Sequence, residues 1–119
     1  MKTILVIEDT STEAFIIKES LSQAGFNIIQ VASSEDAKTK LKEKKPDLIV
    51  TDVVLPGESG FEFCRFLQDE PELSTIPVVI CSTKDSDMDK FWGKKQGAVA
   101  YITKPIATDE LVNTVKLHA

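Results

Sequence analysis

Five short apolar runs alternate along the chain with segments of helical spacing, and this alternation restricts the possible folds more than any other feature. The runs cover residues 4–7, 28–32, 48–50, 76–81 and 99–102. Most of them are continuous and rich in β-branched residues, which is typical of strands buried on both faces of a parallel sheet. We therefore expect five strands.

The segments between these runs carry apolar residues at the 3.6-residue period of a helix. The expected helices cover residues 14–24, 37–41, 60–69, 87–96 and 108–117. Strict alternation of strands and helices requires right-handed crossovers and a parallel sheet with helices on both faces. The sequence thus predicts an α/β fold, a flavodoxin-like (βα)₅ doubly wound parallel sheet with strand order 2-1-3-4-5.

The length of the chain indicates how many domains it forms, and its charge indicates which classes of partner it can bind. The 119 residues correspond to one domain. The net charge is −5 and no basic block is longer than Lys44-Lys45, which argues against a nucleic-acid surface. No apolar run approaches the ~20 residues that cross a bilayer, and Glu8 follows the first run too closely for a signal peptide. We expect a cytoplasmic domain that binds neither nucleic acid nor membrane.

The cysteine and histidine content excludes several catalytic centres. Cys64 and Cys81 lack the spacing of metal ligands, and we expect both to be reduced thiols of the core. His118 is the only histidine. This set cannot form a zinc site, a Ser-His-Asp triad or a Cys-His dyad.

Polar residues follow four of the five predicted strands. They are Glu8 and Asp9 after the first strand, Asp52 after the third, Ser82 and Thr83 after the fourth, and Lys104 and Pro105 after the fifth. In a sheet of this order the carboxyl ends of the strands form the crevice for ligands, and the first and third strands flank the point where the order reverses. We therefore expect Glu8, Asp9 and Asp52 to converge.

Converging carboxylates need a cation or a proton. Two of them about 4 Å apart repel by roughly 4 kcal/mol at an effective dielectric constant near 20. A set of oxygen ligands without imidazole or thiolate suits a hard ion, above all Mg²⁺. One acid at a strand end is most often a helix cap or turn residue. Three acids, a hydroxyl and a lysine at four strand ends favour one shared site.

These residues, together with the stretch Asp-Val-Val-Leu-Pro at 52–56 and Gly60, resemble in order and spacing the receiver domain of two-component response regulators. The resemblance covers the whole chain and is closest to the stand-alone, CheY-like kind. It implies that Asp52 is the phosphoacceptor, which takes a phosphoryl group from a histidine kinase. It also implies that Glu8, Asp9, Asp52 and the backbone carbonyl of Val54 hold Mg²⁺.

The same resemblance assigns roles to three further residues. Lys104 matches the lysine that pairs with the acyl phosphate, and its peptide bond to Pro105 matches one that is cis in the family. Ser82 matches the hydroxyl that turns inward to the phosphoryl group, and Tyr101 matches the aromatic switch residue. The chain is then a receiver over residues 1–119 with no output domain, and its signal leaves through its surface to a downstream protein.

The predicted helix 87–96 leaves two interpretations open. Phe91 and Trp92 are adjacent and cannot both face the core. Either Phe91 is a core residue and Trp92 lies at the rim, or Trp92 and Tyr101 share a surface that binds the downstream protein. Gly93 weakens this helix by about 1 kcal/mol relative to alanine, so the element is expected to be deformable. The sequence motif Trp-Gly-x-x-Gln-Gly-Ala at residues 92–98 resembles that of regulators of twitching motility and pilus chemotaxis.

Three other functions compete with the phosphorylated switch. A Mg²⁺-dependent phosphohydrolase of the haloacid-dehalogenase type needs a second aspartate where Val54 stands. A flavin-binding module needs a phosphate loop where Glu8 and Asp9 would repel a phosphate. A pseudo-receiver, which binds partners without phosphorylation, is disfavoured by the complete set of acids, hydroxyl and lysine. We expect no enzyme activity beyond self-catalysed phosphotransfer and dephosphorylation.

Overall fold

Five strands and five helices alternate along the chain in the computed structural model, which describes all residues from 1 to 119. They are β1 (Thr3–Ile7), α1 (Ser11–Gln23), β2 (Asn27–Val31), α2 (Ser34–Glu43), β3 (Leu48–Thr51), α3 (Gly60–Asp69), β4 (Val78–Ser82), α4 (Asp87–Lys95), β5 (Ala100–Thr103) and α5 (Thr108–His118). All neighbouring strands pair in parallel, in the order β2-β1-β3-β4-β5. The predicted fold class and strand order are confirmed.

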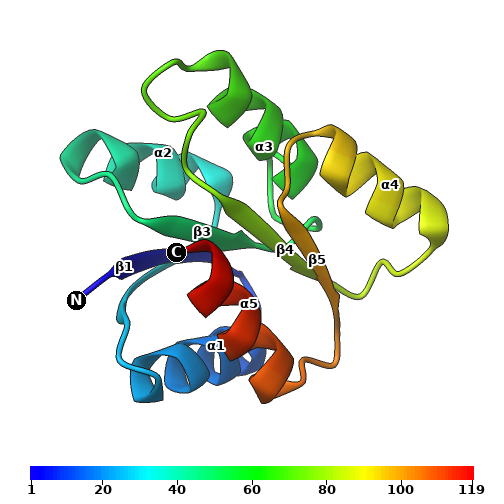
Figure 1. Cartoon of the computed structure of the whole chain (residues 1–119). Coiled ribbons are helices and arrows are strands. Elements are labelled where there is room, and N and C mark those ends of the chain that lie inside the picture. The colour runs from blue at the N-terminus through cyan, green and yellow to red at the C-terminus, as the bar shows by residue number, and fades with distance from the viewer.

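The sheet separates two layers of helices. Figure 1 shows α1 and α5 on one face, and α2, α3 and α4 on the other. Successive residues of β1 enter different cores, with Leu5 and Ile7 in the cluster of 13 buried residues and Ile4 and Val6 in the cluster of 11. Because these strands are buried on both faces of the sheet, β1, β3 and β4 have continuous apolar sequences.

The two edge strands depart from that pattern. In β2 only Val31 is buried, and in β5 only Ile102 is buried. An edge strand has a neighbour on one side only and is covered less completely by the helices. The fourth strand also begins later than expected, at Val78, although the carbonyl of Pro77 still accepts a hydrogen bond of 3.0 Å from Ile49 N.

Serine side chains begin the three helices that share one face of the sheet. The hydroxyls of Ser33, Ser59 and Ser86 accept backbone N–H bonds at the starts of α2, α3 and α4. Such bonds satisfy donors that the first turn of a helix leaves free. None of the helices is long and apolar enough to cross a membrane. Both cysteines are buried and free, as expected, and burial raises the pKa of each thiol to about 12.

Candidate functional site

A buried cluster of charges occupies the carboxyl edge of the sheet. The ammonium of Lys104, just after β5, lies 2.6 Å from Glu8 Oε1 and 2.8 Å from Asp52 Oδ2. The side chains of Lys104 and Glu8 are only 3% and 1% exposed. The ends of β1, β3 and β5 therefore meet where the parallel topology requires them to meet.

Burial and pairing act against each other in this cluster. Burial raises the pKa of Glu8 above its ordinary value, although the hydrogen bond from Lys104 works in the opposite direction. Burial alone would lower the pKa of Lys104, but its hydrogen bonds to Asp52 and Glu8 outweigh that effect and hold it above its ordinary value. The lysine thus remains an ammonium ion, and it is the cation that offsets the repulsion of the two carboxylates.

The backbone around Asp52 holds the other oxygen of its carboxylate. Asp52 Oδ1 accepts hydrogen bonds from Val53 N at 2.6 Å and from Val54 N at 3.2 Å. Gly60, the first residue of α3, packs directly on this segment, and a Cβ at Gly60 would lie 2.0 Å from the Asp52 carbonyl oxygen. Glycine is therefore required at Gly60, because any side chain would push α3 away from the Asp52 peptide.

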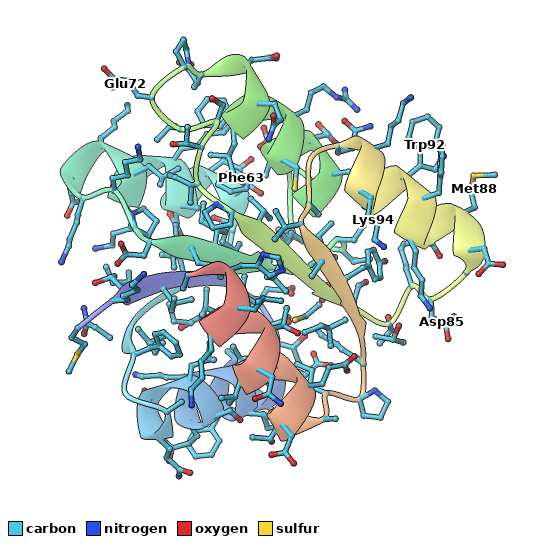
Figure 2. The ribbon with its side chains drawn as sticks, viewed as in Figure 1. Phe63, Glu72, Asp85, Met88, Trp92 and Lys94 are labelled. Atoms are coloured by element: carbon cyan, nitrogen blue, oxygen red, sulfur yellow. The ribbon has the colours of Figure 1, made fainter.

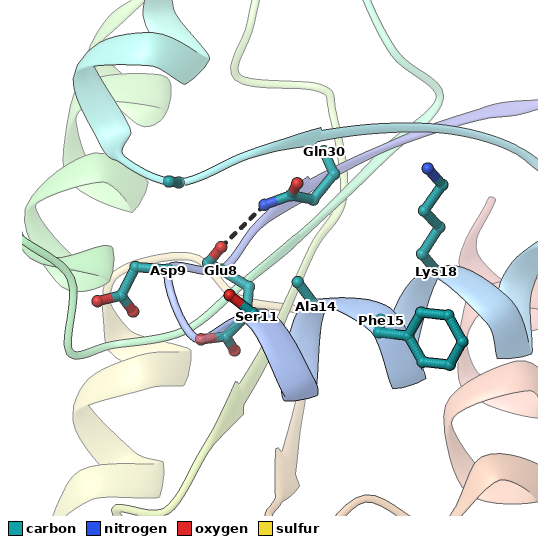
Figure 3. A pocket seen from close by; sticks show the side chains of 8 residues that line it. Glu8, Asp9, Ser11, Ala14, Phe15, Lys18 and Gln30 are labelled. Atoms are coloured by element: carbon teal, nitrogen blue, oxygen red, sulfur yellow. Dashed lines mark hydrogen bonds between the residues drawn. The ribbon is translucent and has the colours of Figure 1, made fainter.

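The turn after β1 is anchored by a residue that the sequence analysis missed. Gln30, on β2, donates from its amide to the carbonyl oxygens of Glu8 at 2.9 Å and Val31 at 3.0 Å, as Figure 3 shows for Glu8. This turn borders a depression of about 380 Å³ that Phe15 and Lys18 also line. An amide inside the apolar run 28–32 was the signal that could have identified Gln30.

A second pocket, of about 250 Å³, opens directly over Asp52. It is lined by Asp9, Thr10, Glu13, Asp52, Val54, Thr83 and Lys104. Asp9 is exposed at this pocket, so it does not join the buried pair formed by Glu8 and Asp52. No three acidic, histidine or cysteine side chains stand close enough together to hold a metal ion as they are placed. The carboxylate and carbonyl oxygens around the pocket nevertheless are the donor types that Mg²⁺ prefers.

The predicted switch residues Ser82 and Tyr101 both bind the backbone of Lys84. The buried Ser82 Oγ accepts a hydrogen bond from Lys84 N at 3.2 Å, and the Tyr101 hydroxyl donates to Lys84 O at 2.6 Å. Burial raises the pKa of Tyr101. Two side chains from neighbouring strands therefore hold one residue of the loop between β4 and α4. We call this arrangement the Lys84 clamp.

Helix α4 presents its aromatic residues to solvent. Phe91 is 57% exposed and Trp92 is 45% exposed, so the interpretation that Phe91 is a core residue is wrong. The two rings contact each other edge to face, with centroids 6.0 Å apart. Figure 2 shows Met88 and Trp92 projecting from α4 away from the sheet. The only buried residue of α4 is Gly93.

Gly93 allows close contact between α4 and the Tyr101 ring. A Cβ at Gly93 would lie 2.8 Å from Tyr101 Cδ2 and 3.1 Å from Ile80 Cδ1. A helix with alanine here would have to displace the Tyr101 ring or move away from it. Gly93 therefore connects the α4 surface to the Lys84 clamp.

Comparison with known proteins agrees with this architecture. The family model for the response regulator receiver domain matches residues 4–116. Protein PilH of Pseudomonas aeruginosa is 37% identical over 97% of this chain and 95% of its own, in agreement with the predicted likeness to pilus regulators. The phosphate regulon regulatory protein PhoB of Rhizobium meliloti is 33% identical over 95% of this chain, which spans 50% of that protein.

Among solved structures, the chemotaxis response regulator CheY4 of Vibrio cholerae superposes with a TM-score of 0.92. It is 25% identical, and the match covers 100% of this chain and 99% of that one. The order of the strands, the charged edge of the sheet and the matched sequence all agree. The chain therefore belongs to the response regulator receiver domain family.

Proposed function

We propose that the protein is a phosphoacceptor switch of a two-component phosphorelay. Asp52 takes a phosphoryl group from a phosphohistidine of a histidine kinase, and the phosphorylated form binds a downstream protein. The observation that carries this proposal is the setting of Asp52. Its Oδ2 faces the Lys104 ammonium at 2.8 Å, its Oδ1 faces two backbone N–H groups, and a pocket opens over it.

The chemistry depends on offsetting negative charge. A carboxylate is a poor nucleophile toward an anionic phosphoryl group unless preorganised positive groups stabilise the charge of the transition state. In the transfer, the bond from phosphorus to the histidine nitrogen breaks and a bond from phosphorus to an Asp52 oxygen forms. The imidazole leaves with the electron pair. Lys104, whose ammonium lies 2.8 Å from Asp52 Oδ2, then pairs with the phosphoryl oxygens of the acyl phosphate on Asp52.

The oxygen donors around the pocket support a Mg²⁺ cofactor. Glu8, Asp9, Asp52 and the Val54 carbonyl are the residues that would hold it, and three of these four residues line the pocket over Asp52. When bound, the ion supplies charge neutralisation for the phosphoryl group in transfer. Because Lys104 already pairs with Glu8 and Asp52, this lysine must share both carboxylates with the ion.

The Lys84 clamp supplies a route from Asp52 to the surface. If the Ser82 hydroxyl turns to the phosphoryl group, Lys84 N loses its acceptor and the loop before α4 loses one of its two anchors. Tyr101 holds the other anchor and packs on Gly93, so a change in the loop reaches α4. We place the surface for the downstream protein on α4 and Tyr101, where Met88, Phe91 and Trp92 are exposed.

Intact mass spectrometry after incubation with Mg²⁺ and acetyl phosphate tests the proposal. The wild type is expected to gain one phosphoryl group and the Asp52→Asn variant none. Asp69→Asn is the matched control, because it makes the same change at an exposed aspartate of α3, and it should gain the group as the wild type does. An unmodified wild type would favour the pseudo-receiver, which binds partners without phosphorylation.

A further inference from the structure

One carboxylate at the phosphorylation pocket has no part in the transfer described above. Glu13 lies in the first turn of α1 and lines the pocket together with Asp52 and Lys104. Its Oε2 is 3.4 Å from Lys104 Nζ, and its side chain is 32% exposed. Lys104 therefore has three carboxylates around its ammonium, of which Glu13 is the most distant and the most exposed.

Glu13 does not make the hydrogen bond that an acidic residue at its position in a helix commonly makes to the capping residue. It is the third residue of α1, a position where an acidic side chain commonly accepts from the N–H of the capping residue. Asp89 makes that bond to Ser86 at the start of α4. In α1, however, the N–H of the capping residue Thr10 already donates to Glu8 Oε2 at 3.2 Å. The Glu13 carboxylate is free to face Lys104 and the pocket.

The charge of Glu13 is in excess at this site. The Lys104 ammonium and one divalent ion, when bound, would together balance the charges of Glu8, Asp9 and Asp52. The carboxylate of Glu13 then adds one uncompensated negative charge to the wall of the pocket that opens over Asp52. The resulting repulsion grows in proportion to the charge of the donor.

We propose that Glu13 is a specificity-determining residue that selects phosphodonors by their charge. This inference rests on the proposed phosphorylation of Asp52. Glu13 slows transfer from doubly charged acyl phosphates more than transfer from donors that carry a single net charge. Small dianionic donors such as acetyl phosphate therefore still phosphorylate Asp52, but more slowly than they would without the Glu13 carboxylate at the pocket.

Initial rates of phosphorylation with two donors test this inference, read by intact mass at saturating Mg²⁺. Acetyl phosphate is a dianion near neutral pH and transfers its group with loss of acetate. Phosphoramidate carries one net negative charge and loses ammonia. In both reactions a new P–O bond forms to Asp52 as the old bond to phosphorus breaks, and the leaving group takes the electron pair.

The Glu13→Gln variant should be phosphorylated about fivefold faster than the wild type by acetyl phosphate and about twofold faster by phosphoramidate, because the repulsion scales with donor charge. Both gains should shrink in high salt, since Glu13 is partly exposed. Glu13→Lys, which reverses the charge instead of removing it, should accelerate both reactions more than Glu13→Gln does. Glu19→Gln, which removes the same charge from an exposed position of α1 away from the pocket, should leave both rates unchanged.

Three results would overturn the inference: no acceleration in Glu13→Gln, equal acceleration with both donors, or the same acceleration in Glu19→Gln. Urea unfolding of each variant shows whether it is folded, and Glu13→Lys provides a second independent substitution. If the wild type accepts no phosphoryl group from either donor, it is the proposed function itself that fails. If the wild type is modified and Glu13→Gln behaves like it, only the role of Glu13 fails.

Discussion

The charged cluster at Asp52 and the surface of α4 depart from ordinary protein composition in opposite ways. At the cluster, Glu8, Asp52 and Lys104 are charged residues removed from solvent. On α4, Phe91 and Trp92 are large apolar residues exposed to it. Charged groups are almost never fully buried unless paired, and contiguous exposed apolar groups commonly mark interaction sites.

The difference indicates where each region obtains its stability and what each can do. The buried charges depend on one another, because the Lys104 ammonium donates hydrogen bonds to both Glu8 and Asp52. The exposed aromatics Phe91 and Trp92 contact each other and lie outside both hydrophobic cores. Tyr101 lies between the two regions, because its hydroxyl donates to Lys84 O and its ring packs on Gly93.

The largest effect is expected when the cluster loses its cation. Lys104→Met leaves the carboxylates of Glu8 and Asp52 buried without a cation between them, which should lower the free energy of unfolding by about 3–5 kcal/mol in urea titrations near neutral pH. Added Mg²⁺ should restore part of this loss if the carboxylates bind it. The control is Lys94→Met on exposed α4, which should be nearly neutral. Equal effects of the two substitutions would remove the contrast between the regions.

A smaller effect, which depends on pH, is expected at Glu8. Burial raises the pKa of Glu8 above its ordinary value of 4.5, so the folded state holds this proton to a higher pH than the unfolded chain does. The unfolding free energy of the wild type should therefore fall relative to that of Glu8→Gln as pH rises from about 4.5 through the folded pKa. Metal-free unfolding curves across this range measure the difference. If the unfolding free energy of the wild type rises relative to that of Glu8→Gln as pH increases, the pKa of Glu8 is not raised in the folded state.

At Gly93 two effects oppose each other. Gly93→Ala gains about 1 kcal/mol of helix propensity but forces the Tyr101 ring to move. The net change in stability should stay within about 1 kcal/mol, whereas the NMR signals of Tyr101, the only tyrosine, should shift clearly. Lys94→Ala, one residue away and exposed, is the control. Unshifted tyrosine signals in Gly93→Ala would show that the helix does not hold the ring.

The smallest effect on stability is expected on the α4 surface itself. Replacing both Phe91 and Trp92 by serine should change the free energy of unfolding by no more than about 0.5 kcal/mol, because neither ring is part of the core. Phosphorylation of Asp52 by acetyl phosphate should be unaffected. Thermal and urea unfolding provide the first test, and intact mass the second. A large loss of stability would mean that the aromatics are structural and that the surface is not free for a partner.

The sequence predicted the charged edge well because topology alone determines it. In a parallel sheet all carboxyl ends lie at one edge, so Glu8 and Asp52 meet as expected, whereas Asp9 is exposed at the pocket and does not join them. The sequence did not reveal that Lys104 would be the cation between the carboxylates, because that depends on side-chain conformation. Glu13 was missed for the same reason. Its position in a helix first turn gives no sign of whether it caps the helix or faces a pocket.

The α4 region was predicted less well because its features arise from contacts distant in sequence. Gly93 was interpreted as a weakness of the helix, but its space is filled by the Tyr101 ring from β5. Phe91 and Trp92 left two interpretations open, since helical spacing cannot say how far a helix stands from the sheet. The Lys84 clamp joins Ser82 and Tyr101 through a backbone residue, which no side-chain pattern reveals.

A phosphoryl group on Asp52 is expected to change the α4 surface. Trp92 is the only tryptophan, so its indole N–H gives a single signal in a ¹H–¹⁵N NMR spectrum. With Mg²⁺ and acetyl phosphate, this signal should shift in the wild type in proportion to the phosphorylated fraction measured by intact mass, and it should stay in place in Asp52→Asn. A wild type that is fully phosphorylated while the Trp92 signal and the α4 amide signals remain unchanged would contradict this expectation.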